Sequence, residues 1–176
     1  AYVNPPNIVK NYRDISEQEY EHCFLSLLEQ AGAGSKHTKV KRASDFDFGR
    51  VDFTVTLDFP KVAAQIKFFV ETKPQPRPSQ FPFIDLAERY RSTNPGETVI
   101  PVLAAPSISD RIAELCKKHG WSWFDLSGNC RIKAPGPIYI ERKGFEAKYK
   151  QPRPLANLGT AASARVLRTL LVAKHA

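Results

Sequence analysis

Cysteine and long apolar runs are scarce in this 176-residue chain, and each shortage excludes a class of protein. Cys23, Cys116 and Cys130 are an odd number without a close pair, which excludes a disulfide framework and a four-thiolate zinc site. No run of about 18 apolar residues occurs, so the sequence predicts no membrane-spanning helix. We therefore expect a cytoplasmic protein in a reducing compartment that is not bound to a membrane.

Methionine is absent, including at position 1, and we expect the sequence to be a piece of a longer or processed chain. A chain of this length typically forms one main domain with its own core. Composition predicts three segments: an α/β domain at 1–143, a linker at 144–158, and a helical segment at 159–176. The last segment is either an arm that docks on a partner or the start of a second, winged-helix-like domain.

Acidic residues are scarce near the C-terminus. Residues 1–100 contain 13 basic and 13 acidic side chains, whereas residues 131–176 contain ten basic and two acidic ones. This density favours a polyanionic partner such as nucleic acid, although a solvated basic tail is the alternative. The side chains that we expect to contact nucleic acid are Arg131, Lys133, Arg142 and Lys143, together with Arg77 in a proline-rich loop.

Hydrophobic periodicity predicts one helix followed by a hairpin. Ser16 begins a helix with a capping box, and Gly32 ends it. Apolar residues alternate with polar ones over 51–59, as in a half-buried strand, and a second strand is predicted over 62–72. Pro60 lies between them, which predicts an antiparallel pair.

The remaining pattern predicts a mixed α/β protein with a central sheet flanked by helices. Residues 34–50 are a polar stretch that leads into the first predicted strand, and no element is predicted within it. The later predicted elements are a helix around 83–90, a buried strand at 98–105, a helix from a cap at Ser107 to Gly120, and strands at 121–126, 131–134 and 138–141. Residues 125–129, Asp-Leu-Ser-Gly-Asn, predict a turn in which Asp and Asn satisfy backbone groups, with substrate contact as the alternative.

Two acidic residues occur at neighbouring ends of the predicted hairpin. Asp52 begins its first strand and Glu71 ends its second, so antiparallel pairing would bring them side by side. Carboxylates and the carbonyl of Thr72 are oxygen ligands that suit Mg²⁺ or Mn²⁺. Lys73 lies two residues after Glu71, on the same strand face, where it could orient the attacking water. The pattern predicts metal-dependent hydrolysis of a phosphodiester.

Asp52 followed by Glu71-Thr72-Lys73 resembles the motif of the PD-(D/E)xK nuclease superfamily. The order of predicted elements over 16–142 is similar to its restriction endonuclease-like fold, of αβββαβ type, here with a C-terminal helical extension. Two features depart from the family pattern. Val51 replaces the usual proline, and the two acids are more widely spaced than in compact versions of the motif.

The first predicted helix resembles that of archaeal Holliday-junction resolvases, in which a glutamate approaches the metal. Glu21 matches this glutamate, and Glu17 is the second choice. The resemblance implies a metal-dependent DNA endonuclease with Glu21 as an accessory acid, and a homodimer, since many members of the superfamily act as dimers. The alternatives are a nuclease-like nucleic-acid-binding or regulatory module without catalytic activity, and a defence or toxin effector that cleaves RNA.

Overall fold

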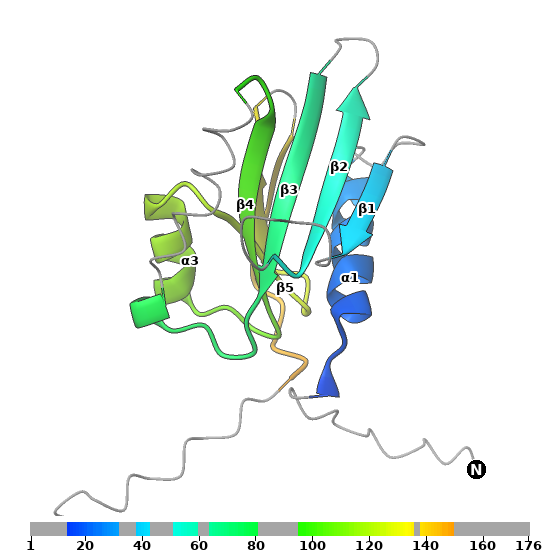
Figure 1. Ribbon diagram of the computed structural model, residues 1–176. Helices are drawn as coiled ribbons and strands as arrows, with labels where there is room; N and C mark the ends of the chain where they lie inside the picture. The colour runs from blue at the N-terminus through cyan, green and yellow to red at the C-terminus, as the bar shows by residue number, and fades with distance from the viewer. Residues whose placement is uncertain are drawn as a thin grey trace, which may run out of the picture.

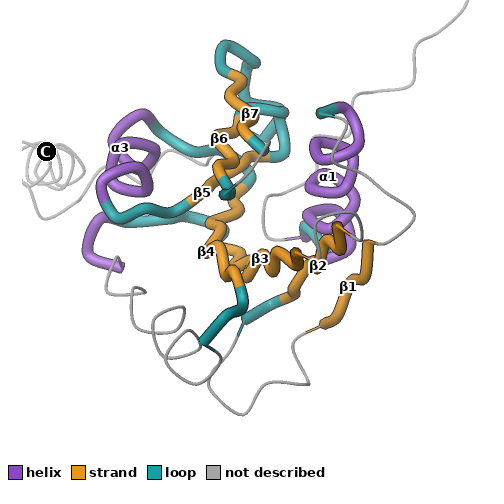
Figure 2. The backbone as a smooth tube through the Cα atoms, turned by 90° about the horizontal axis from the view of Figure 1, so that it is seen from above, coloured by secondary structure: helices purple, strands orange, loops and turns teal. Residues whose placement is uncertain are grey.

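The computed structural model describes residues 14–31, 38–42, 51–59, 64–80, 95–135 and 138–149. Its strands form one mixed sheet, ordered β1 to β7 as in the sequence (Figure 1). Helix α1 (Glu17–Gln30) covers one face of the sheet, and helix α3 (Asp110–Lys118) covers the other (Figure 2). The predicted α/β class with a helix-flanked mixed sheet is confirmed for the described residues.

The first three strands form an antiparallel meander: β1 (Thr38–Arg42), β2 (Phe53–Phe59) and β3 (Ala64–Thr72). The predicted hairpin is confirmed, with Phe53 opposite Val70 at the end that carries the two acids. The sequence predicted no strand in the polar stretch 34–50, whereas β1 lies within it and pairs along β2. Its sequence, TKVKR, has a single apolar residue and no alternation, as is common for lysine-rich edge strands.

Strand β4 (Thr98–Ala105) lies at the centre of the sheet and pairs in parallel with β3 and with β5 (Ser122–Asp125). Seven of its eight residues are buried, as the continuous apolar run predicted. The sheet continues antiparallel through β6 (Cys130–Lys133) and β7 (Tyr139–Arg142). A short 3-10 helix, η4 (Pro78–Gln80), follows β3.

Helix α3 begins later than predicted. Its N-cap is Ser109, whose Oγ accepts a hydrogen bond from the Ile112 N–H at 3.4 Å, so Ser107 is not the cap. Both serines can cap a helix, and the burial of Ile112 and Cys116 against the sheet selects the later start.

The two cores lie on opposite faces of the sheet. On the α1 face, the Phe24 ring packs edge-on against Phe68, with centroids 5.3 Å apart, and stacks on Phe124 at 5.1 Å. Such pairs add about 0.5–1.5 kcal/mol to the burial of each ring. On the α3 face, the buried residues are Leu103, Ile112, Ala113, Cys116, Trp121 and Trp123.

Several predictions concern residues outside those described. They are the helix around 83–90, the end of the linker at 150–158 and the helical segment at 159–176. The division into domains therefore stays a prediction. Within the described residues, no helix is both long and apolar enough to cross a membrane.

Candidate functional site

The carboxyl ends of the parallel strands β3, β4 and β5 lie at one edge of the sheet, where ligands commonly bind in α/β proteins. The Lys73 N–H donates to the Ala104 carbonyl at 2.8 Å, and the Leu126 N–H donates to the Ala105 carbonyl at 3.3 Å. Lys73 and the turn after β5 are therefore attached to successive residues at the end of β4. The first turn of α1 lies at the same end of the molecule (Figure 1).

Asp52 lies in a bend just before β2 and is tied to the end of β3. Its N–H donates to the Val70 carbonyl at 3.2 Å. Its Oδ2 accepts hydrogen bonds from the Thr72 N–H at 2.6 Å and from the Thr72 Oγ1 at 2.8 Å. Both bonds go to one carboxylate oxygen, so the second oxygen can take a ligand.

Glu71 and Lys73 form an ion pair at the end of the same strand. The Lys73 Nζ lies 2.7 Å from the Glu71 Oε1, and their side chains are 30% and 19% exposed. This agrees with the prediction that the two side chains share a strand face. Thr72, between Glu71 and Lys73, donates to Asp52 with its N–H and its hydroxyl, so Asp52 and the ion pair lie at the same strand end.

Asp52 also lies near the first turns of α1. Burial raises the pKa of Tyr20, and electrostatic interactions with Tyr149, Glu19 and Asp52 raise it further. Glu21, the next residue of α1, is half-buried, and Glu17 is exposed. Both stay candidates for the accessory acid.

The described residues contain no group of three or more His, Cys, Asp or Glu side chains placed to hold a metal ion. Glu21, Asp52 and Glu71 therefore do not form a closed set of ligands. Mg²⁺ needs less, because it keeps several waters and is commonly bound through one or two carboxylates. Asp52 and Glu71 each have one oxygen bonded within the protein and one for a ligand, so this donor set fits Mg²⁺ or Mn²⁺.

The predicted nucleic-acid-binding residues divide between the two faces of the sheet. Arg131 and Lys133 alternate with buried residues on β6 and share its outer face, opposite Glu141 and Tyr139 of β7. Tyr139 is 57% exposed, which places an aromatic ring beside the two cations.

Arg142 lies apart from these two cations. Its guanidinium donates to the Gln30 side-chain carbonyl at the end of α1, on the other face of the sheet. Lys143 follows it and is exposed, and exposed Arg77 lies in the loop after β3. The five predicted residues thus do not share one surface.

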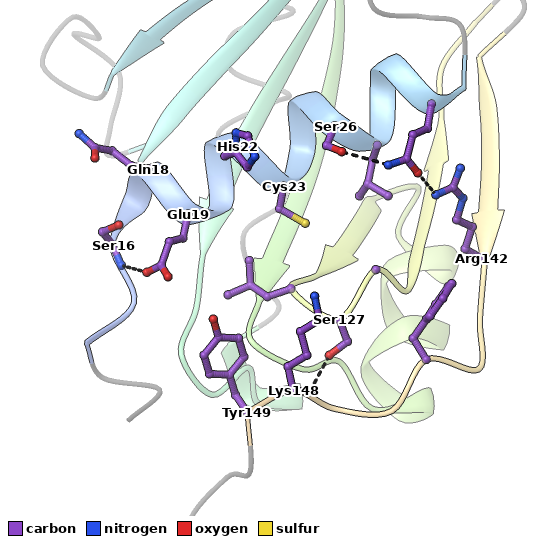
Figure 3. A pocket seen from close by; sticks show the side chains of 15 residues that line it. Ser16, Gln18, Glu19, His22, Cys23, Ser26, Ser127, Arg142, Lys148 and Tyr149 are labelled. Carbon is purple, nitrogen blue, oxygen red and sulfur yellow. Dashed lines mark hydrogen bonds between the residues drawn. The ribbon is translucent and has the colours of Figure 1, made fainter. Parts of the chain in front are cut away.

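A groove that the sequence did not predict lies between α1 and the segment after β7 (Figure 3). Its volume is about 610 Å³. The turn after β5 forms part of its wall, through Leu126, Ser127 and Gly128. The only sequence signal for it was the turn motif at 125–129.

The turn at 125–129 is held by Asp125, as predicted. Its Oδ1 accepts from the Ser127 N–H at 2.9 Å and from the Asn129 N–H at 3.0 Å, while its Oδ2 accepts from the Asn129 side-chain amide at 3.0 Å. Asp125 is 1% exposed, so this carboxylate stabilises the turn and does not contact solvent.

No protein family profile matches the chain, and no curated protein does. Among solved structures, a repair endonuclease from Pyrococcus abyssi is similar, with a TM-score of 0.40 and 20% identity. The match covers 64% of this chain and 47% of the endonuclease, so this chain spans about half the length of that protein. This is a distant structural resemblance, and catalytic activity does not follow from it.

Proposed function

We propose that the domain is a metal-dependent endonuclease of the PD-(D/E)xK type that hydrolyses DNA phosphodiester bonds. The observation that carries the proposal is the juxtaposition of Asp52, Glu71 and Lys73 at the paired ends of β2 and β3. These are the acid, acid and lysine of the motif, at an edge of the sheet where ligands bind.

In this proposal, Asp52, Glu71 and the carbonyl of Thr72 hold a Mg²⁺ or Mn²⁺ ion. The bound metal would supply Lewis-acid stabilisation of phosphate charge and a more acidic water. The N–H and hydroxyl of Thr72 orient the Asp52 carboxylate, since both donate to its Oδ2. Lys73, held by Glu71 at 2.7 Å, orients the attacking water and offsets charge on the phosphate.

A second function has its own supporting observation. Asp52 is bonded to Thr72, Glu71 is paired with Lys73, and no third metal-ligating side chain joins them among the described residues. A nuclease-like module that binds nucleic acid without cleaving it is consistent with acids that each have a partner within the protein. Binding that persists in EDTA without any cleaved product would favour this module.

The test is cleavage of supercoiled plasmid by the full chain, with Mg²⁺ or Mn²⁺, in parallel with EDTA. Glu71→Gln is the site variant, and Glu114→Gln is the matched control, because Glu114 is exposed on α3 on the other face of the sheet. We expect metal-dependent cutting by the chain and by the control, and none by Glu71→Gln. Equal cutting by Glu71→Gln would refute the proposed site.

A further inference from the structure

The walls of the groove come from distant parts of the chain. One wall is α1, with His22, Cys23 and Ser26, and the other is the turn after β5 together with the segment after β7. The Cys23 Sγ lies 3.6 Å from the Asp125 carbonyl oxygen and donates to it, which ties α1 to the start of the turn after β5. The groove is therefore a fixed feature of the fold and not a gap between loosely placed segments.

The wall after β7 is held by hydrogen bonds to the turn. The Asn129 side chain accepts from the Phe145 N–H and donates to the Phe145 carbonyl, both at 3.0 Å. The Lys148 N–H donates to the Ser127 Oγ at 3.0 Å. These bonds fix the backbone at 145 and 148, so the side chains of Phe145 and Lys148 are presented from a rigid base.

The charged side chains that line the groove are mainly cationic. Figure 3 shows the Lys148 side chain pointing toward α1, and its charge lowers the pKa of the Cys23 thiol, against the dominant effect of burial. Within the described part of the chain, no carboxylate pairs with the Lys148 ammonium. Arg142 binds the neutral Gln30, and the acidic Glu19 accepts a hydrogen bond from the Ser16 N–H at 3.0 Å. An anion entering the groove would meet two cations, Lys148 and Arg142, and one carboxylate, Glu19.

Two aromatic residues, Phe145 and Tyr149, line the same groove as these cations. Phe145 is 53% exposed, although an apolar ring of this size is usually buried. The ring lies over Gly128, so close that a Cβ at this glycine would be 3.8 Å from the ring Cδ2. Tyr149 lines the groove as well and packs partly against the core. An exposed ring such as Phe145, in a groove that cations also line, is typical of sites that stack nucleobases.

We propose that this groove binds a nucleotide, with the base on Phe145 and Tyr149 and the phosphate on Lys148 and Arg142. The nucleotide is either part of a single strand or a free mononucleotide, which present the same chemistry. The groove lies next to the candidate active site, because Leu126 and Lys73 are bonded to successive carbonyls of β4. A DNA strand bound at Asp52 and Glu71 could therefore extend into the groove.

This inference rests on the proposed function, since it assigns a binding site to the substrate strand. Its test measures binding and does not require cleavage. The assay is fluorescence anisotropy of a labelled single-stranded DNA of about 12 nucleotides in EDTA, within the site sizes usual for such binding. The variants are Phe145→Ala and Lys148→Gln in the full chain. Lys118→Gln is the control, because Lys118 is exposed at the end of α3 on the opposite face.

We expect Phe145→Ala to weaken binding by about tenfold, which is typical for loss of one stacking ring. Lys148→Gln should weaken it and reduce the salt dependence by about one phosphate contact. Lys118→Gln should bind as the unmodified chain does. Both substituted side chains are exposed, and circular dichroism verifies that the variants fold. Equal binding by all three variants would overturn the inference.

Competition with deoxyadenosine monophosphate separates the two sources of the ligand. Displacement of the oligonucleotide by the mononucleotide, lost in Phe145→Ala, supports a mononucleotide site. If the mononucleotide does not displace the oligonucleotide, and Phe145→Ala weakens binding of the oligonucleotide, the groove is a site for a single strand. The two proposals can also fail separately. If the chain does not cut DNA but the groove variants bind it more weakly, the groove proposal stands and the nuclease proposal fails. If the chain cuts DNA and the groove variants bind it normally, the nuclease proposal stands and the groove proposal fails.

Discussion

Two aspartates at the same end of the sheet use their carboxylates in opposite ways. Asp125 is buried, and both its oxygens accept hydrogen bonds, three in total, from within its own turn. Asp52 is half-buried, and the two bonds from Thr72 go to a single oxygen. The first carboxylate is saturated by the protein, whereas the second retains an oxygen at the edge of the sheet.

The difference separates a structural acid from a candidate ligand. A buried carboxylate that is fully bonded by protein groups stabilises the fold, because leaving its donors unpaired would be costly. A carboxylate held in place by one oxygen is oriented but still able to bind a metal with the other. Substitutions at the two positions should therefore change different properties: catalysis at Asp52 and stability at Asp125.

The largest expected effect is on activity at position 52. Asp52→Asn retains a side-chain oxygen that can accept from Thr72, but it removes the negative charge that a metal ion requires. We expect plasmid cleavage to fall below detection while the urea midpoint changes little. Asp125→Asn, measured in the same assay as the matched substitution, should retain its cleavage per folded molecule. Cleavage by Asp52→Asn at the unmodified rate would show that Asp52 is not a metal ligand in catalysis.

A smaller loss of activity is expected at Lys73, which pairs with Glu71 beside Asp52. Lys73→Gln removes the charge and the ability to orient water, and groups of this kind contribute about 10²- to 10⁴-fold to rates. We expect a loss in kcat within this range, with DNA binding in EDTA almost unchanged. Lys67→Gln is the control on the same strand, paired with Glu97 at 2.7 Å. An equal loss in both variants would show that the effect is general electrostatics and not catalysis.

The stability half of the comparison is tested at position 125. Asp125→Ala leaves two backbone N–H groups and the Asn129 amide without their acceptor in a buried turn. We expect it to reduce the free energy of unfolding by about 3 kcal/mol, since each unsatisfied buried donor costs about 1–3 kcal/mol. Urea unfolding followed by circular dichroism measures this. Asp52→Ala, whose donors lie at the strand end, should cost less, and the reverse order would contradict the comparison.

Much of the fold could be predicted because its signals are local. The capping box of α1, the alternation in β2 and the apolar run of β4 each occupy one continuous segment. Strand β1 was missed because a charged edge strand carries no apolar alternation, and its existence depends on pairing with β2. The start of α3 was misplaced by two residues because two serines offer equivalent caps and only tertiary packing selects Ser109.

For the candidate site, the sequence predicted which strand ends come together but not the contacts of each side chain. Antiparallel pairing brings the start of β2 beside the end of β3 whatever the side chains do, so the proximity of Asp52 to β3 followed from the pattern. The partner of each carboxylate did not, because it depends on the bend at Asp52 and on rotamers. The groove was not predictable either, since its walls meet through Cys23 and Asp125, which are 102 positions apart.

The smallest expected effect is on the thiol of Cys23, which donates to the main-chain carbonyl of Asp125. Burial raises the pKa of Cys23 from 9.0 to about 11; the charge of Asp125 adds to this and Lys148 opposes it. Because the folded pKa lies above the unfolded value, the contribution of this thiol to stability is complete below pH 9 and is lost as the pH rises toward 11.

Alkylation of Cys23 by iodoacetamide, followed by mass spectrometry, tests this directly. At about pH 8 the reaction should be slower in the folded chain than in urea, because the thiolate is the reactive form. Asp125→Asn should speed it by lowering the pKa of Cys23, whereas Lys148→Gln should slow it by raising that pKa. The rate of buried Cys116, whose pKa burial raises to about 12, is the internal reference and should be insensitive to both substitutions. An unchanged alkylation rate of Cys23 in Asp125→Asn would mean that Asp125 acts only through its hydrogen bonds. The charge of Asp125 would then play no part in the difference between Asp125 and Asp52.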